Sequence, residues 1–129
     1  MSGGAQRRVS EEEYLALERS SSEKHEYVNG ELFLMSGATY NHVLITMNLA
    51  RLLGNALVGK DCRVLAMDMR VKAEMTRNYF YPDLLGFCGV PEFGDNRQDT
   101  LLNPCLLVEV LSPSTRGYDK DRKFQSYRR

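Results

Sequence analysis

Long apolar runs are absent from this sequence of 129 residues. A membrane-spanning helix needs about 20 consecutive apolar residues, and no stretch here approaches that length. Arg7 and Arg8 lie near the N-terminus without an apolar segment behind them, so the start does not resemble a signal peptide. We therefore expect a protein without a membrane anchor, located in the cytoplasm.

Cysteine is also scarce, with only Cys62, Cys88 and Cys105. The three are far apart, and no CxxC or Cys/His spacing is present, so neither a zinc site nor a disulfide framework is indicated. We expect three small buried side chains that behave as apolar groups.

An excess of either charge is missing, since 17 basic residues balance 17 acidic ones. This balance argues against a protein that coats nucleic acid without specificity. The distribution is uneven, because residues 10–31 are acidic and residues 116–129 are basic. The basic end could hold phosphates, although a solvated helix face is the commoner meaning of such a pattern.

The length suits one domain. We expect residues 1–9 to be a disordered lead and residues 10–129 to form a single α/β domain. The pattern ends inside a helix at Arg129, which predicts a domain truncated at its C-terminus or completed by a partner. The expected elements are a capped helix at 11–18, a hairpin at Asn29–Gly30, a helix at 41–58 with one apolar stripe, strands at 62–73 and 79–87, a polar loop at 89–103, a strand at 105–111 covered on both sides, and a helix from about 118.

Two carboxylates stand in apolar strand patterns. Glu109 is the only charged residue between Pro104 and Leu111, and an unpaired buried carboxylate costs several kcal/mol. Asp83 lies in the preceding strand pattern, directly after Pro82. Each alone could be structural, Glu109 as a salt bridge and Asp83 as a turn residue. Together, on consecutive strands, they can converge on one hard cation.

Lys123 follows in the last helical pattern. Asp119, Lys123 and Tyr127 recur at i, i+4 and i+8, so they line one helix face. If that helix packs over the strand, Lys123 can reach both carboxylates. Without them it would be an ordinary exposed lysine.

Several strings resemble the Uma-type putative restriction endonucleases of the PD-(D/E)XK superfamily. The segment Val108-Glu109-Val110-Leu111-Ser112-Pro113-Ser114-Thr115 is the most specific of them. The resemblance runs from about Glu11 to Arg129. It also includes Tyr81-Pro82-Asp83-Leu84, Tyr118-Asp119, Lys123, Glu26-Tyr27-Val28-Asn29-Gly30-Glu31 and Asn41-His42.

The resemblance implies a restriction-endonuclease-like core, with a mixed central β-sheet flanked by helices. It implies Mg²⁺ or Mn²⁺ held by Asp83 and Glu109, with Glu26 completing the shell. Position 111 is Leu, so Lys123 takes the part of the lysine in Glu-x-Lys. DNA and further copies of the chain are the implied partners. The expected substrate or supporting residues are His42, Arg116, Asp119 and Tyr127.

Two other functions remain open from the residues alone. One is a non-catalytic, truncated nuclease fold that acts as a binding module. The other is a small acid/base enzyme in which Glu109 acts without metal. Carboxylates that respond to Mg²⁺ or Mn²⁺ would distinguish the nuclease from both.

Overall fold

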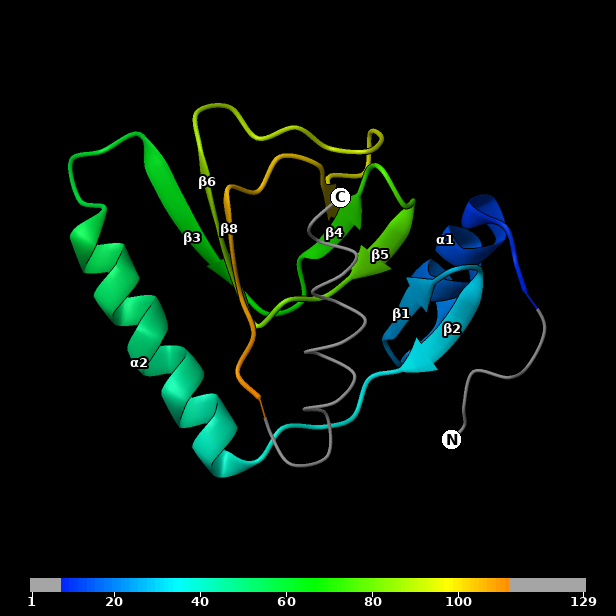
Figure 1. Cartoon of the computed structure of the whole chain (residues 1–129), viewed down its shortest axis with the longest axis horizontal. Coiled ribbons are helices and arrows are strands. Elements are labelled where there is room, and N and C mark those ends of the chain that lie inside the picture. The colour runs from blue at the N-terminus through cyan, green and yellow to red at the C-terminus, as the bar shows by residue number, and fades with distance from the viewer. Residues whose placement is uncertain (1–7, 112–129) are drawn as a thin grey trace.

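The structure, a computed structural model, describes residues 8–111 and is a mixed α/β fold, as expected (Figure 1). No helix in this range is long and apolar enough to cross a membrane. In chain order the elements are α1 (Glu11–Ser20), β1 (His25–Val28), β2 (Glu31–Leu34), α2 (Tyr40–Ala56), β3 (Cys62–Ala66), β4 (Arg70–Ala73), β5 (Asn78–Phe80), β6 (Leu84–Cys88), β7 (Thr100–Leu101) and β8 (Leu106–Val108).

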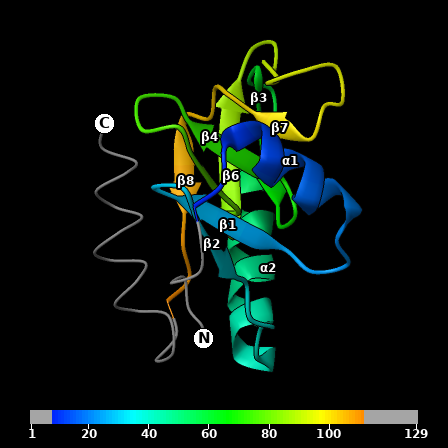
Figure 2. The ribbon, with the colours of Figure 1, turned by 90° about the vertical axis from the view of Figure 1, so that its right-hand side faces the viewer.

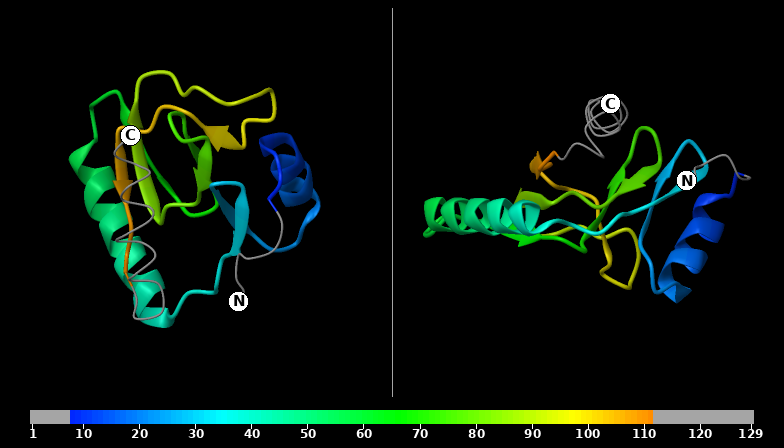
Figure 3. Two further views of the ribbon diagram at one scale, coloured as in Figure 1. Left: turned by 45° about the vertical axis from the view of Figure 1, so that its right-hand side comes forward. Right: turned by 90° about the horizontal axis from the view of Figure 1, so that it is seen from below.

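The described strands form two sheets rather than one central sheet. The larger has the order β2-β1-β5-β4-β7, and the smaller has the order β3-β6-β8. Among the strands of residues 8–111, only β4 and β7 pair in parallel, and the other pairs are antiparallel. Helix α2 lies beside β3, and α1 lies at the far side of the molecule against the larger sheet (Figures 1 and 3). Figure 2, turned by 90°, shows α1, β1 and β2 toward the viewer and α2 behind them.

Helix α1 begins as the sequence predicts. Ser10 Oγ accepts the Glu13 N–H at 3.1 Å, and Glu13 Oε1 accepts the Ser10 N–H at 2.9 Å. This reciprocal capping satisfies two N–H groups that the first turn would otherwise leave unpaired. The helix packs on the larger sheet through Tyr14, whose ring centre lies 4.9 Å from that of Tyr27 and 5.2 Å from that of Tyr79.

The hairpin between β1 and β2 is also confirmed. Asn29 has φ of 53° and Gly30 has φ of 85°, so both turn residues occupy the left-handed region. A two-residue turn of this kind matches the twist of the flanking strands. The register that follows pairs Val28 with Glu31 and Glu26 with Phe33.

The prediction of a single strand at 62–73 is wrong, because the structure has two strands there, β3 and β4. The predicted strand breaks after Ala66, where Met67 and Asp68 have φ of 42° and 58°, and β4 then joins the other sheet. The strand predicted at 79–87 breaks in the same way between Phe80 and Leu84. The Met67 N–H donates to the Asp83 carbonyl at 3.1 Å. The segment between β3 and β4 and the segment between β5 and β6 therefore pass between the sheets at the same point. Asp83 therefore lies at the junction of the two sheets.

Strand β8 is shorter and less covered than the sequence suggests. It spans Leu106–Val108, and Leu106 is 43% exposed. In the described part of the chain β8 is the edge strand of its sheet, paired with β6 on one side. The loop predicted at 89–103 also contains a short strand, because Thr100 and Leu101 pair with Arg70 and Val71.

Two further burial expectations are wrong. Helix α2 does not bury one complete apolar stripe: Ile45 is 47% exposed and Leu52 is 56% exposed, while Thr46 faces inward at 2%. The cysteines are not three buried apolar groups, since Cys62 and Cys88 form a disulfide and Cys105 is exposed. The disulfide arises because Cys62 and Cys88 are directly opposed in the β3–β6 register, which the spacing of 26 residues does not reveal.

Candidate active site

The segment that carries Asp83 is fixed at both ends. Ahead of it, the Tyr81 N–H donates to Glu26 Oε2 at 2.8 Å, and Glu26 is 1% exposed. Behind it, β6 begins at Leu84 inside the smaller sheet. The Asp83 carbonyl accepts the Met67 N–H between these two anchors. Backbone paired in this way holds the Asp83 side chain in one place.

The Asp83 carboxylate has two defined neighbours. Its Oδ2 accepts the Val110 N–H at 2.6 Å. Its Oδ1 lies 3.0 Å from His42 Nε2, with the two side chains 19% and 22% exposed. The buried Nε2 of His42 faces this carboxylate, but the two groups are not aligned as a hydrogen bond. The carboxylate thus lies between the start of β6, the end of β8 and the first turn of α2.

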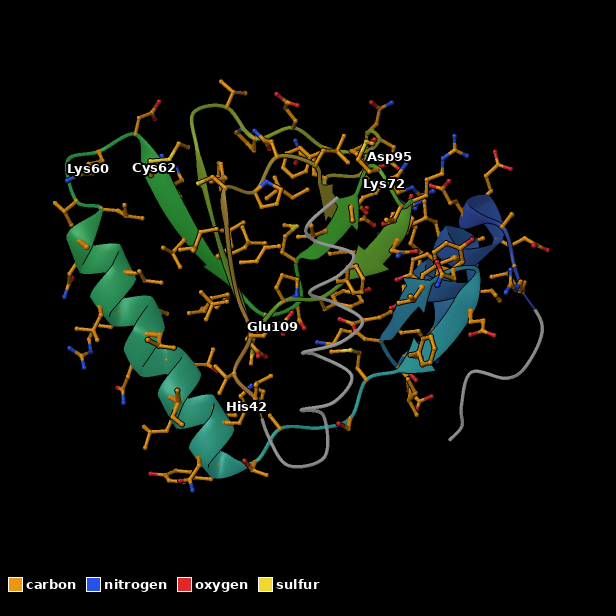
Figure 4. All side chains as sticks on the ribbon, in the orientation of Figure 1. His42, Lys60, Cys62, Lys72, Asp95 and Glu109 are labelled. Carbon is orange, nitrogen blue, oxygen red and sulfur yellow. A yellow bond between two sulfur atoms is a disulfide. The ribbon has the colours of Figure 1, made fainter. Side chains whose placement is uncertain are left out.

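Glu109 follows β8 directly, one position beyond the last pair of the β6–β8 register. Leu84 pairs with Val108, and if the antiparallel pairing continued by one position, it would bring Asp83 opposite Glu109. Opposed residues of such a ladder lie on the same sheet face, with Cβ atoms about 5 Å apart. The Val110 N–H bond to Asp83 supports this proximity. Figure 4 shows Glu109 at the lower end of β8.

His42 is held by the first turn of α2. Thr39 is the N-cap, and its hydroxyl accepts the His42 N–H at 3.2 Å. The Thr46 hydroxyl donates to the His42 carbonyl at 2.8 Å. The N-terminal turn of a helix carries partial positive charge, which favours a carboxylate or phosphate nearby. The end of α2 that faces Asp83 is therefore suited to anions.

A cavity of about 330 Å³ opens beside these groups. Asp83 and His42 form part of its wall, together with Tyr81 and Thr46. Lys24 and Asp68, which form an ion pair, lie at the same cavity. Asp83 thus borders a space that can admit a ligand, as an active-site residue must.

The donor set fits a magnesium ion better than a transition metal. Within residues 8–111 no three His, Cys, Asp or Glu side chains are gathered as a ready metal site. Mg²⁺ is commonly held by one or two carboxylates and takes its remaining ligands from water and phosphate. Asp83 and Glu109 are carboxylates of the kind that such an ion takes, and their joint use as ligands stays a prediction.

Glu26 was expected to complete the metal shell. The structure places its Oε2 on the Tyr81 N–H, two residues before Asp83. This contact positions the chain that carries Asp83, and coordination of metal by Glu26 stays a prediction. Lys123, Arg116, Asp119 and Tyr127 lie outside the described residues, and their roles stay predictions as well.

A buried polar network surrounds Tyr81, two residues before Asp83, and the sequence patterns did not predict it. The Tyr81 hydroxyl donates to Glu18 Oε2 at 2.6 Å, and Arg70 donates to that hydroxyl at 3.0 Å. Arg70 also donates to Thr100 Oγ1 at 2.9 Å and lies 3.0 Å from Asp99. Burial raises the pKa of Tyr81, so its phenol stays protonated and can donate. One sequence feature could have indicated this network. Glu18 follows Tyr14 by four residues, which places a carboxylate on the buried face of α1.

Asp99 links this network to α1 and predicts a pH-dependent stability. Hydrogen bonds from Arg19 lower its pKa from the usual 3.8 to about 2. A pKa depressed by folding adds stability above about pH 4, which is lost as the pH falls toward 2. Asp99→Asn should therefore be less stable than wild type at pH 7, and the gap should close between pH 4 and pH 2. Urea unfolding at several pH values measures this, with Asp61→Asn in an exposed turn as the control. A gap that stays constant across that range would contradict the assignment.

Comparison with solved structures identifies the class of fold. The crystal structure of a putative nuclease belonging to DUF820 from Anabaena variabilis superposes with a TM-score of 0.71, over 92% of this chain and 67% of that one. The identity is 14%, so this likeness shows a nuclease-like α/β fold and no more.

The sequence itself identifies the family. Residues 11–129 match the Uma2 family, described as putative restriction endonuclease, and the chain belongs to that family. It is 40% identical over 116 residues to the uncharacterized protein sll1609 of Synechocystis, covering 90% of this chain and 66% of that protein. It is 40% identical over 122 residues to slr1290 of the same organism, covering 93% and 62%. The chain thus spans about two thirds of the length of these relatives.

Proposed function

We propose that the protein is a metal-dependent endonuclease that hydrolyses phosphodiester bonds in DNA. The observation that carries the proposal is the Asp83 carboxylate at the sheet junction, bonded to the backbone directly after Glu109. Asp83 immediately precedes β6 and Glu109 immediately follows β8, and Asp83 Oδ2 accepts the Val110 N–H at 2.6 Å. Membership in a family described as putative restriction endonucleases supports the same reaction.

Asp83 and Glu109 would hold Mg²⁺ or Mn²⁺ between them. When bound, such an ion polarises the phosphate and lowers the pKa of a bound water. The protein's own part would be to fix the two carboxylates, and the Val110 N–H bond to Asp83 and the position of Glu109 directly after β8 support this role. Glu26 fixes the Tyr81 backbone and through it the approach of Asp83.

Other residues would act on the phosphate. His42, at the N-terminal turn of α2, would favour the substrate's negative charge. Lys123 would stabilise the charge that develops on the phosphoryl oxygens, as the family resemblance implies. The basic segment 116–129, with Arg116, would contact the DNA backbone, while Asp119 and Tyr127 would support Lys123. DNA and a second copy of the chain are the partners included in the proposal.

Dependence on a divalent ion tests the proposal directly. The purified chain is incubated with duplex and single-stranded DNA in the presence of Mg²⁺, Mn²⁺, or EDTA. Cleavage should require Mg²⁺ or Mn²⁺ and should vanish with EDTA, because the carboxylates alone cannot neutralise the phosphate. Titration calorimetry with Mn²⁺ should show binding without DNA.

Other results would separate the alternatives. Cleavage that persists unchanged in EDTA would favour metal-free acid/base chemistry at Glu109. A chain that binds DNA but neither binds Mn²⁺ nor cuts either substrate would be the non-catalytic binding module.

A further inference from the structure

The three cysteines meet at the end of the smaller sheet opposite the candidate active site. Cys62 begins β3, Cys88 ends β6, and Cys105 immediately precedes β8. Their strands are neighbours in the order β3-β6-β8, with Cys88 on the central strand. Figure 4 shows Cys62 at the upper end of this sheet and Glu109 at the lower end. The cysteines are therefore not part of the carboxylate site.

The central sulfur has two sulfur neighbours. Cys88 is disulfide-bonded to Cys62, its directly opposed residue in the register. The Sγ of Cys105 lies 3.9 Å from the Sγ of Cys88. The Cys105 N–H donates to the Gly86 carbonyl at 2.8 Å, which holds Cys105 beside β6. A sulfur–sulfur bond is about 2 Å long, so Cys105 needs to move about 2 Å to bond Cys88.

Access to this cluster is open. Cys88 and Cys105 are both exposed, so thiols and disulfides in solution can reach them. A thiolate held beside a disulfide is the arrangement from which thiol–disulfide exchange proceeds. Buried structural cysteines are inert by comparison.

We propose that Cys62, Cys88 and Cys105 form a thiol–disulfide exchange site. The Cys105 thiolate attacks the Cys88 Sγ, the Cys88–Cys105 bond forms, and the Cys62–Cys88 bond breaks. Cys62 leaves as a thiolate and takes up a proton, replacing the one that Cys105 lost. No external oxidant or reductant is consumed, because one disulfide and one thiol are present before and after.

The exchange changes which strands are joined covalently. In the observed state the bond ties β3 to β6. After exchange it would tie β6 to β8, the strand that leads to Glu109. The bond to Cys105 would therefore fasten the edge strand of the smaller sheet.

Peptide mapping tests this site without reference to nuclease activity. The full chain is equilibrated at pH 8 with a mixture of reduced and oxidised glutathione, quenched with acid, alkylated and digested with trypsin. Cleavage after lysine and arginine places the three cysteines on separate peptides, at 61–63, 78–97 and 98–116. Mass spectrometry should find both Cys62–Cys88 and Cys88–Cys105 linkages. Exchange from the first to the second should be faster at pH 8 than at pH 6, since the thiolate is the nucleophile.

Three variants make the assignment falsifiable. Cys62→Ser should form Cys88–Cys105, and Cys105→Ser should form only Cys62–Cys88. Cys88→Ser removes the shared sulfur and should leave the other two cysteines open to alkylation. The proposal is overturned if wild type yields only Cys62–Cys88 with Cys105 fully alkylated, and Cys62→Ser forms no Cys88–Cys105 bond. A predominant Cys62–Cys105 linkage, or no linkage in any redox mixture, would overturn it equally.

Discussion

Asp83→Asn and Glu109→Gln should each lower the rate of DNA cleavage by roughly a hundredfold or more. Each change removes one negative charge from the proposed ion's ligands and keeps the side-chain size. A bound metal contributes several kcal/mol of charge stabilisation in the transition state, and about 1.4 kcal/mol corresponds to a tenfold rate change. Both variants should also bind Mn²⁺ more weakly by calorimetry.

The fold of these variants should be retained. Asn at position 83 can still accept the Val110 N–H through its amide oxygen, so the link between β6 and β8 persists. Thermal unfolding followed by circular dichroism measures this. The matched control is Asp68→Asn, a carboxylate beside the same cavity whose side chain is 76% exposed. Near wild-type activity in Asp83→Asn, or equal losses in Asp68→Asn, would refute the metal-site assignment.

Lys123→Ala separates binding from catalysis. It should leave Mn²⁺ binding unchanged while lowering the cleavage rate, since the proposed role of Lys123 lies in the transition state. Parallel calorimetry and cleavage assays on this variant measure the two effects. Loss of metal binding in this variant would place Lys123 in a structural role instead.

Arg70→Met should destabilise the protein by about 3 kcal/mol, the cost typical of breaking a buried ion pair. Arg70 is 4% exposed and contacts Tyr81, Thr100 and Asp99. Met fills a similar volume but removes the donors that Arg70 gives to the Tyr81 and Thr100 hydroxyls. Urea unfolding at pH 7 measures the free energy of unfolding.

The control for Arg70→Met is Arg77→Met. Arg77 is 76% exposed, and its nearest carboxylate oxygen, on Glu11, is 3.8 Å away. Exposed ion pairs contribute about 0–1 kcal/mol, so this variant should unfold close to wild type. Equal losses in the two variants would show that the buried network adds nothing beyond a surface charge.

The sequence by itself determined the features that depend on neighbouring residues. The Ser10–Glu13 capping box and the Asn29–Gly30 turn were predictable because each is completed within four residues. The long helix followed from its periodicity, and α2 occupies nearly the predicted range. Asp83 and Glu109 were recognisable as charges in apolar strand patterns, and the family strings pointed to the same pair. Charge in an apolar run is a local anomaly that needs no coordinates to detect.

Only the tertiary structure decided the features that depend on register and burial. The alternating pattern at 62–73 continues through Met67 and Asp68, yet the chain changes sheets there, because the Asp83 carbonyl and Lys24 bind those residues from distant segments. The Cys62–Cys88 bond depends on the β3–β6 register, and the Arg70 network depends on Glu18 of α1 reaching the Tyr81 hydroxyl. Such contacts join residues dozens of positions apart. The energy of each contact depends on which polar groups are buried together. Patterns of neighbouring residues do not reveal which distant groups share a buried site.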